Sequence, residues 1–94
     1  MRKGILTTEI QKEAKDFLGR EITVVELRLY SYLDYTMKNS QIIEPIRVNQ
    51  EERKILSILR HEEHIEGGAS GLGMTRDFYD YINRVLWLGY VKGE

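Results

Sequence analysis

The chain has 94 residues, a formal net charge of −1, 41% hydrophobic residues and 31% charged residues. This composition is ordinary for one small globular domain and far from that of a disordered chain. The near-neutral charge removes the electrostatic argument for nucleic acid that a strongly basic chain provides, so DNA binding would require a local basic face. We expect a single domain over residues 1–94, with a helical pair in residues 1–40.

Further classes of protein are excluded by cysteine content and hydropathy. The chain has no cysteine, so disulfides and thiolate metal sites cannot contribute, and a cytoplasmic location is favoured. No apolar run approaches the roughly 18 residues of a membrane span. The first residues also become polar too soon for a secretory signal. We therefore expect no membrane partner.

The first predicted helix begins at a pair of capping residues. Thr8 and Gln11 have capping-box spacing, in which the hydroxyl accepts a backbone amide and the glutamine reaches back. Apolar residues then recur at helical spacing, and Gly19 is a natural left-handed stop. A short helix ending at Gly19 is expected.

A longer helix is predicted next. Thr23 and Glu26 have capping-box spacing, and the helical pattern continues to about Lys38. Tyr30 and Tyr35 lie on the flanks of this helix. Five residues gather on its inward face: Val25, Leu29, Tyr32, Leu33 and Thr36.

Residues 41–48 are rich in strand formers, but Pro45 has no N–H, so a short edge strand or an extended connector is expected. Asn49 and Glu52 then form a capping box that opens a third helix over residues 50–63. The residues expected to face inward are Ile55, Leu56, Ile58 and Leu59. Those expected to face outward are Arg53, Lys54, Ser57, Arg60 and His61.

Residues 66–73 contain four glycines, which predicts a loop with room for one helical turn at residues 69–72. Thr75 caps the final helix, expected over residues 76–88 and stopped by Gly89. Tyr90, Val91 and Lys92 are expected to form a strand.

Motifs for catalysis and cofactors are weak in this sequence. His61 and His64 are three residues apart, whereas a zinc-protease helix needs two histidines four apart and a third ligand. The glycine-rich loop also lacks the preceding strand and the Gly-Lys-Ser/Thr ending of a phosphate loop. We expect polar surface at the histidines, no metal, no cofactor and no enzymatic activity.

The final helix has two distinct faces. Its packed face gathers Phe78, Ile82, Val85 and Leu86, with Tyr81 on the flank. The opposite face gathers Arg76, Asp80, Asn83, Arg84 and Trp87, with Tyr79 at the border. A tryptophan on a polar helix face is costly to leave in water and is a preferred interface anchor. Either another part of the domain covers Trp87, or it contacts another molecule.

Residues 48–92 resemble a winged helix-turn-helix domain. The order is a capped helix, a short element at about 68–73, a Thr-capped helix, and the exit VLWLGYV at residues 85–91. The resemblance implies that the 76–88 helix enters the major groove, with any wing truncated or built from residues 42–48. It also implies a set of DNA contacts: Thr75, Arg76, Tyr79, Asn83 and Arg84 on the reading helix, and Arg53, Lys54 and Lys92 on phosphates. The chain is similar in this respect to small regulators of viruses and archaea, which for a viral protein implies the host cytoplasm.

Two functions follow as expectations for a mainly α, winged-helix-like fold of about four helices with a minor two-stranded β element. The first is a small DNA-binding transcription regulator that acts as a homodimer, with Trp87, Tyr30 and Tyr35 at the subunit interface. The alternative is a non-enzymatic protein-interaction module, such as a small viral or regulatory adaptor, in which Trp87 anchors a partner protein. Asp77 and Asp80 favour the alternative, because they would repel phosphate.

Overall fold

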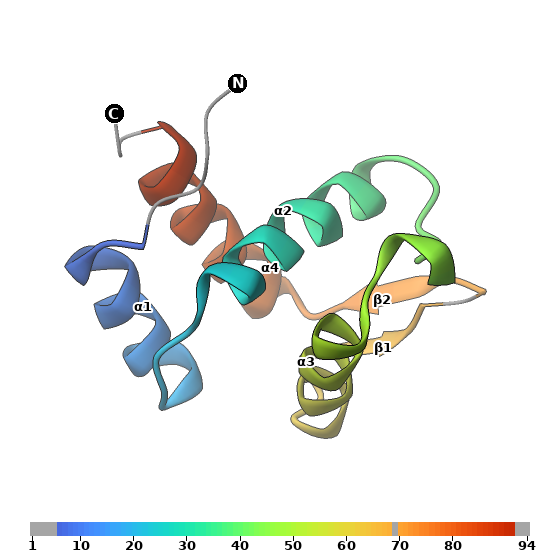
Figure 1. The fold of residues 1–94 in the computed structure, drawn as a ribbon, viewed down its shortest axis with the longest axis horizontal. Helices are drawn as coiled ribbons and strands as arrows, with labels where there is room; N and C mark the ends of the chain where they lie inside the picture. The colour runs from blue at the N-terminus through green and yellow to red at the C-terminus, as the bar shows by residue number, and fades with distance from the viewer. Residues whose placement is uncertain (1–5, 69, 92–94) are drawn as a thin grey trace.

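The computed structural model describes residues 6–68 and 70–91 (Figure 1). These residues form a mainly α fold with a small antiparallel hairpin, as the sequence predicts. The helices are α1 (Thr8–Leu18), α2 (Val24–Lys38), α3 (Gln50–His61) and α4 (Arg76–Leu86). The hairpin pairs β1 (Ile65–Gly67) with β2 (Leu72–Met74), a 3-10 turn η1 spans Pro45–Arg47, and a π-helical turn η2 spans Trp87–Val91.

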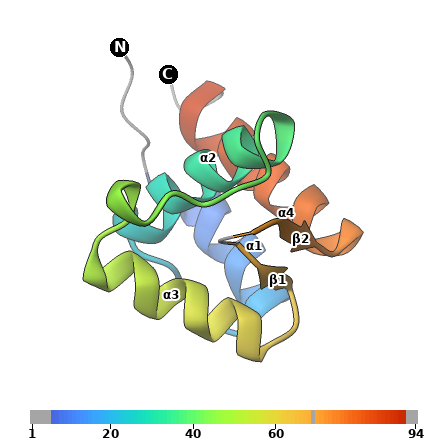
Figure 2. The ribbon, with the colours of Figure 1, turned by 90° about the vertical axis from the view of Figure 1, so that its right-hand side faces the viewer.

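Helix α2 lies across α4, and together they form the centre of the molecule (Figures 1 and 2). Helix α1 packs against α4 and η2 on one side, while α3 and the hairpin lie on the other side. One continuous core draws on all four helices and the hairpin. Its largest fully buried side chains are Tyr30, Phe78 and Tyr81, so aromatic rings fill the space between α2 and α4.

Three of the four predicted helix caps are confirmed. Thr23 Oγ1 accepts the Glu26 amide at 3.2 Å, and Thr75 Oγ1 accepts the Phe78 amide at 3.2 Å. Asn49 and Glu52 form the full reciprocal capping box that begins α3. A cap of this kind contributes about 1 kcal/mol of stability.

The predicted cap of the first helix is wrong by one residue. Thr7, not Thr8, accepts the Ile10 amide, at 3.2 Å. Gln11 does not reach back to the cap, because its amide group bonds both backbone groups of Ile22, at 2.8 Å and 2.9 Å. Gln11 therefore fastens the loop between α1 and α2. The stop at Gly19 is confirmed, with φ at +79°.

The inward faces of α2 and α3 differ from those predicted. Tyr30 is fully buried although it was expected on a flank, whereas Val25 and Tyr32 are half-buried. On α3, Leu56 and Leu59 are buried, but Ile58 is 46% exposed. Helix α2 is contacted by both α3 and α4, so it buries a wide surface, while α3 packs mainly through one narrow stripe against α2 and β1.

The connector and the glycine-rich segment pair with each other. Residues 41–48 form no strand and contain only η1. The Ile43 amide donates to the Gly68 carbonyl at 2.7 Å, and the Leu72 amide donates to the Gln41 carbonyl at 2.6 Å. The expected loop at 66–73 is wrong, because it contributes to both hairpin strands, and Leu72 lies in β2 rather than in a helical turn. A Cβ on Gly67 would collide with the Gly71 carbonyl oxygen, so the tight turn requires glycine there.

The prediction of a carboxyl-terminal strand at residues 90–92 is also wrong for residues 90 and 91. The predicted stop of the last helix at Gly89 is wrong as well, because the α-helix ends at Leu86 and the chain continues through Gly89 in η2, which also includes Tyr90 and Val91. Lys92 lies outside the described residues. The hairpin of this fold therefore precedes α4, and no strand follows that helix up to residue 91.

Candidate functional site

The outer face of α4 carries most of the residues predicted to read DNA. Arg76 is the most open, with its side chain 89% exposed and its Nε 3.8 Å from Asp80 Oδ2. Arg84 Nε instead donates to Glu13 Oε1 on α1 at 3.0 Å. Asn83 Nδ2 donates to the carbonyl of Tyr79 on its own helix at 2.9 Å. A base edge would have to share these side chains with the contacts that Asn83 and Arg84 make inside the protein.

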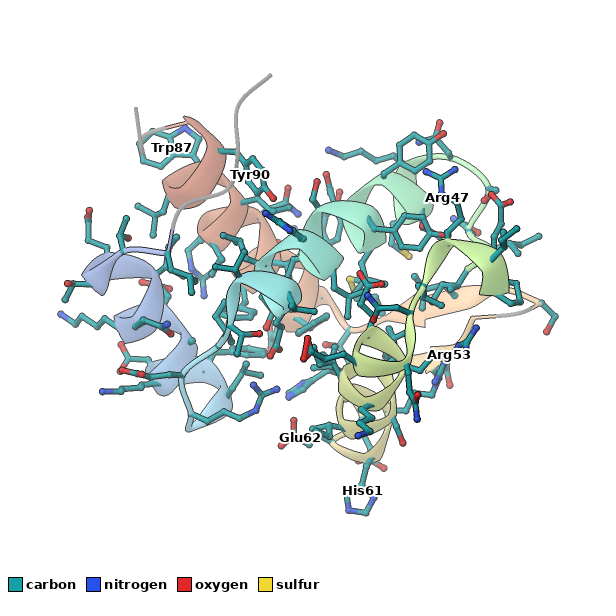
Figure 3. The ribbon with its side chains drawn as sticks, viewed as in Figure 1. Arg47, Arg53, His61, Glu62, Trp87 and Tyr90 are labelled. Atoms are coloured by element: carbon teal, nitrogen blue, oxygen red, sulfur yellow. The ribbon has the colours of Figure 1, made fainter. Side chains whose placement is uncertain are left out.

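The other predicted DNA contacts are dispersed. Thr75 is exposed, and its hydroxyl oxygen accepts the Phe78 amide as the cap of α4; Tyr79 is half-buried against the core. Arg53 and Lys54 are exposed on α3. Figure 3 shows Arg53 far from Trp87, so Arg53 does not extend the outer surface at the end of α4.

The three predicted interface residues have different environments. Trp87 is 53% exposed and Tyr35 is 57% exposed, so both are accessible. Tyr30 is fully buried, which makes its predicted place in an interface wrong. Its hydroxyl has partners inside the protein, and this polar satisfaction is what allows a tyrosine to be buried.

Trp87 borders a surface depression of about 630 Å³ between α1 and the end of α4. It lies nine residues after the buried Phe78, half a helical turn away from the packed face. The ion pair between Arg84 and Glu13 fastens α1 to α4 beside it. We call this depression the Trp87 surface; its lining residues are Glu13, Asp80, Asn83, Arg84, Trp87 and Leu88.

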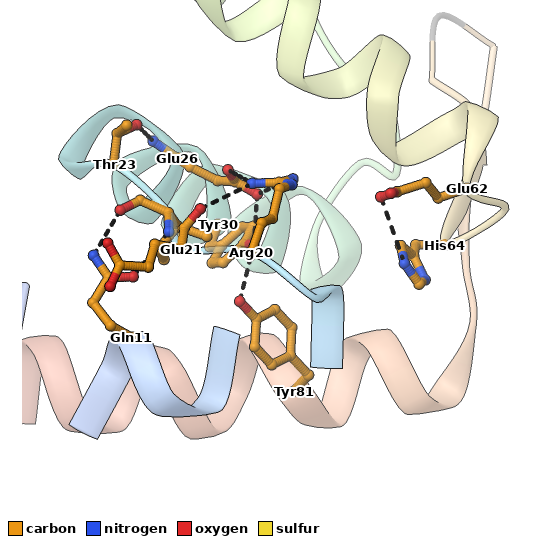
Figure 4. Close-up of polar contacts among 10 residues, drawn as sticks. Gln11, Arg20, Glu21, Thr23, Glu26, Tyr30, Glu62, His64 and Tyr81 are labelled. Carbon is orange, nitrogen blue, oxygen red and sulfur yellow. Dashed lines mark hydrogen bonds and ion pairs between the residues drawn. The ribbon is translucent and has the colours of Figure 1, made fainter. Parts of the chain in front are cut away.

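A buried polar network at the centre of the fold was not anticipated from the sequence. Glu26 is 2% exposed and accepts both Nη1 and Nη2 of Arg20, at 2.8 Å and 3.1 Å (Figure 4). The Tyr30 hydroxyl donates to the same carboxylate at 2.6 Å and lies 3.2 Å from the Tyr81 hydroxyl. The network thus connects the loop before α2 with α2 and α4. The capping-box spacing predicts instead that the Glu26 side chain bonds the backbone at the start of α2.

This environment shifts the pKa values of three members of the network. The hydrogen bonds to Glu26 raise the pKa of the Arg20 guanidinium. Burial raises the pKa of Tyr30 far above its ordinary value, and burial raises the pKa of Tyr81 to about 12. All three shifts favour a charged arginine and neutral tyrosines in the folded protein.

Stability is therefore expected to fall at alkaline pH. Above the ordinary tyrosine pKa of 10.0, the unfolded chain loses a Tyr81 proton that the folded chain keeps up to about 12. The unfolded state then binds fewer protons, so the free energy of unfolding decreases as pH rises, by about 1.4 kcal/mol per pH unit for this tyrosine. Urea unfolding at pH 9 and pH 11 measures the loss, which should be about 1.4 kcal/mol smaller in Tyr81→Phe. An equal loss in both proteins would contradict this assignment.

The two histidines have separate roles. His61 is exposed, as predicted. His64 is not simple polar surface: it is half-buried, its ring stacks on Phe78 at 5.2 Å between centroids, and it lies 5.1 Å from the Phe17 ring. It therefore packs the turn after α3 against α1 and α4. In the part of the chain that the structure describes, no group of three or more His, Asp or Glu side chains is placed to hold a metal ion.

Protein-family models, curated proteins and solved structures were compared with the chain, and none matches it. In residues 6–68 and 70–91, no helix has both the length and the apolar character that a membrane crossing requires.

Proposed function

We propose that this chain is a non-enzymatic protein-interaction module that binds a partner protein through the Trp87 surface. The observation that carries the proposal is the exposure of Trp87, 53%, beside a depression of about 630 Å³. Tryptophan is among the residues that most often dominate binding energy, because its large ring is stabilised when a partner removes it from water. The absence of cysteine makes the cytoplasm the proposed location.

The rim of the Trp87 surface supports the same function. Asp80, Asn83 and the pair of Arg84 with Glu13 surround the indole and Leu88 with polar groups. An apolar centre with a polar rim is the usual organisation of a protein interface. The depression therefore suits a partner segment that inserts an apolar side chain beside the indole and hydrogen-bonds to the rim.

A homodimeric DNA-binding regulator is the second candidate. It is favoured by Arg76, whose side chain is 89% exposed at the amino end of α4, the end that enters the groove in helix-turn-helix proteins. Asp77 and Asp80 on the same helix oppose phosphate, and Asn83 and Arg84 are engaged within the protein. These features favour protein binding over DNA binding.

The test uses the fact that Trp87 is the single tryptophan of the chain, so its fluorescence reports directly on the surface. Peptides selected from a random display library on the intact protein should shift the emission to shorter wavelength. Trp87→Ala should weaken their binding, followed with labelled peptide, by at least about tenfold. The matched control is Tyr35→Ala, which removes an aromatic ring of similar exposure from α2 and should leave binding unchanged. Equal affinity of Trp87→Ala and the unaltered protein would overturn the proposal.

Two further measurements separate the alternatives. Sedimentation of the free protein reports whether a second copy occupies the surface, in which case a dimer should dissociate in Trp87→Ala. Titration with random-sequence duplex DNA at low and physiological salt tests the second candidate. Binding that weakens with salt and is lost in Arg76→Ala combined with Arg84→Ala would favour the regulator over the protein-interaction module.

A further inference from the structure

A second indentation, of about 290 Å³, lies between α3 and the connector that precedes it. We call it the arginine notch. Its apolar walls come from both segments, and two arginines of α3 border it. The lining residues are Ile43, Pro45, Val48, Arg53, Leu56 and Arg60. Figure 3 shows Arg53 far from Trp87, so the notch is separate from the Trp87 surface.

Backbone carbonyls hold both guanidinium groups in place. Arg53 Nη2 donates to the Pro45 carbonyl at 3.0 Å, and Arg60 Nε donates to the Gly67 carbonyl at 2.9 Å. A Cβ on Gly68 would lie 2.9 Å from Arg60 Nη2, so the glycine leaves the space that this arginine occupies. The two arginines are seven residues apart on α3, about 10 Å along the helix axis. Because these contacts already order the two arginines, a ligand that binds them costs less side-chain entropy than one that binds two free arginines.

Neither arginine of the notch forms an ion pair within the part of the chain that the structure describes. Arg20, Arg76 and Arg84 each lie within ion-pairing distance of a carboxylate. Among the described residues, Arg53 and Arg60 have no such partner. Each also keeps N–H donors that its single carbonyl contact does not use. The unused donors and the unpaired charge favour a ligand that brings carboxylates or phosphates.

The apolar walls decide between these ligands. A volume of about 290 Å³ is at the lower limit for a small-molecule pocket, and it suits one apolar side chain. On the connector that forms one wall of the notch, Ile46 is 90% exposed and Ile42 is 42% exposed. A nucleic-acid backbone offers phosphates and sugars, which gain less from aliphatic walls than an apolar side chain does, whereas a peptide offers both an apolar side chain and carboxylates.

We propose that the arginine notch binds an acidic peptide segment of a partner protein. One apolar side chain of the peptide enters between Ile43, Pro45 and Leu56. Carboxylates on either side of it pair with Arg53 and Arg60, and the peptide covers Ile46. This second docking surface makes the protein bivalent, and it does not depend on the Trp87 surface being occupied.

The experiment uses labelled heptapeptides in which a central leucine is flanked by three Asp or Glu residues on each side. Fluorescence anisotropy should detect binding to the intact protein at low salt, weakening as salt rises. Arg53→Gln combined with Arg60→Gln should reduce the affinity by at least about tenfold. Lys54→Gln is the matched control, because it removes a positive charge from the same helix outside the notch, and it should change the affinity less than about twofold.

Peptide variants keep the test valid if the arginine substitutions loosen the fold. With the unaltered protein, replacing the leucine by serine should weaken binding by about fivefold or more. Replacing the acidic residues by lysine should abolish it. Equal binding of the leucine and serine peptides, or no binding of the acidic peptide, would overturn the proposal. Tighter binding of duplex DNA that is lost in the same double arginine variant would overturn it in favour of a phosphate surface.

Discussion

Arg20→Met is expected to lower the free energy of unfolding by about 3 kcal/mol, because it leaves the Glu26 carboxylate buried without its positive partner. Arg20 supplies two hydrogen bonds to Glu26, and only the Tyr30 hydroxyl would remain as a side-chain donor to it. The Arg20 side chain is 33% exposed, so water would reach part of the vacated site, which keeps the expected loss at the lower end of the range for broken buried pairs. Urea unfolding followed by circular dichroism measures the change.

Two further variants test whether the loss of stability comes from the buried, unpaired carboxylate. Lys15→Met breaks an ion pair with Glu21 in which both side chains are mostly exposed, and it should change stability by less than about 0.5 kcal/mol. Arg20→Met combined with Glu26→Met removes both charges at similar volume and should recover most of the loss. If the double variant is as unstable as Arg20→Met alone, the unpaired carboxylate is not the cause.

Phe78→Ala is expected to cost about 4 kcal/mol of stability, because it leaves a cavity in the buried core. Phe78 is fully buried at the start of α4, and its ring contacts those of Phe17, Tyr30, His64 and Tyr81. These rings come from α1, α2, the turn after α3 and α4, so the cavity would open where the elements converge. The midpoint of urea unfolding should shift strongly downward.

The control for this truncation is an aromatic ring on the surface. Tyr35 is 57% exposed on α2, and Tyr35→Ala should alter stability by less than about 0.5 kcal/mol. Comparing the two variants separates the effect of burial from the effect of losing an aromatic ring anywhere in the protein. A loss below about 1 kcal/mol in Phe78→Ala would mean that the surrounding rings close the space, against the tight packing described above.

Helix positions were predictable because their signals are local. The caps at Thr23, Asn49 and Thr75 each depend on a side chain and an amide three residues away. The stop at Gly19 depends only on its own positive φ. The choice of Thr8 over Thr7 failed because both hydroxyls precede the same apolar pattern, and the partner of Gln11 is the distant Ile22.

The hairpin and the buried network were not predictable because their determinants are distant in sequence. The glycine-rich segment resembles a free loop until Ile43 and Gln41 supply backbone partners for Gly68 and Leu72. Glu26 has a capping-box position, and nothing near it in sequence indicates that Arg20 and Tyr30 will enclose its carboxylate. Local spacing predicted that Trp87 lies off the packed face of the last helix but left open whether another segment covers it. The arginine notch required the connector to fold against α3.

The dependence of α1 on α4 has a consequence for synthesis of the chain on the ribosome. Helix α1 finds its main contacts on α4 and η2, and α2 also packs against α4. Until residues 76–86 have emerged, the faces of α1 and α2 that pack against α4 have no surface to cover them. Before α4 emerges, the nascent chain therefore displays apolar helix faces, which are the surfaces that molecular chaperones bind and that promote aggregation. Folding of the core therefore waits for α4, the helix that directly precedes Trp87.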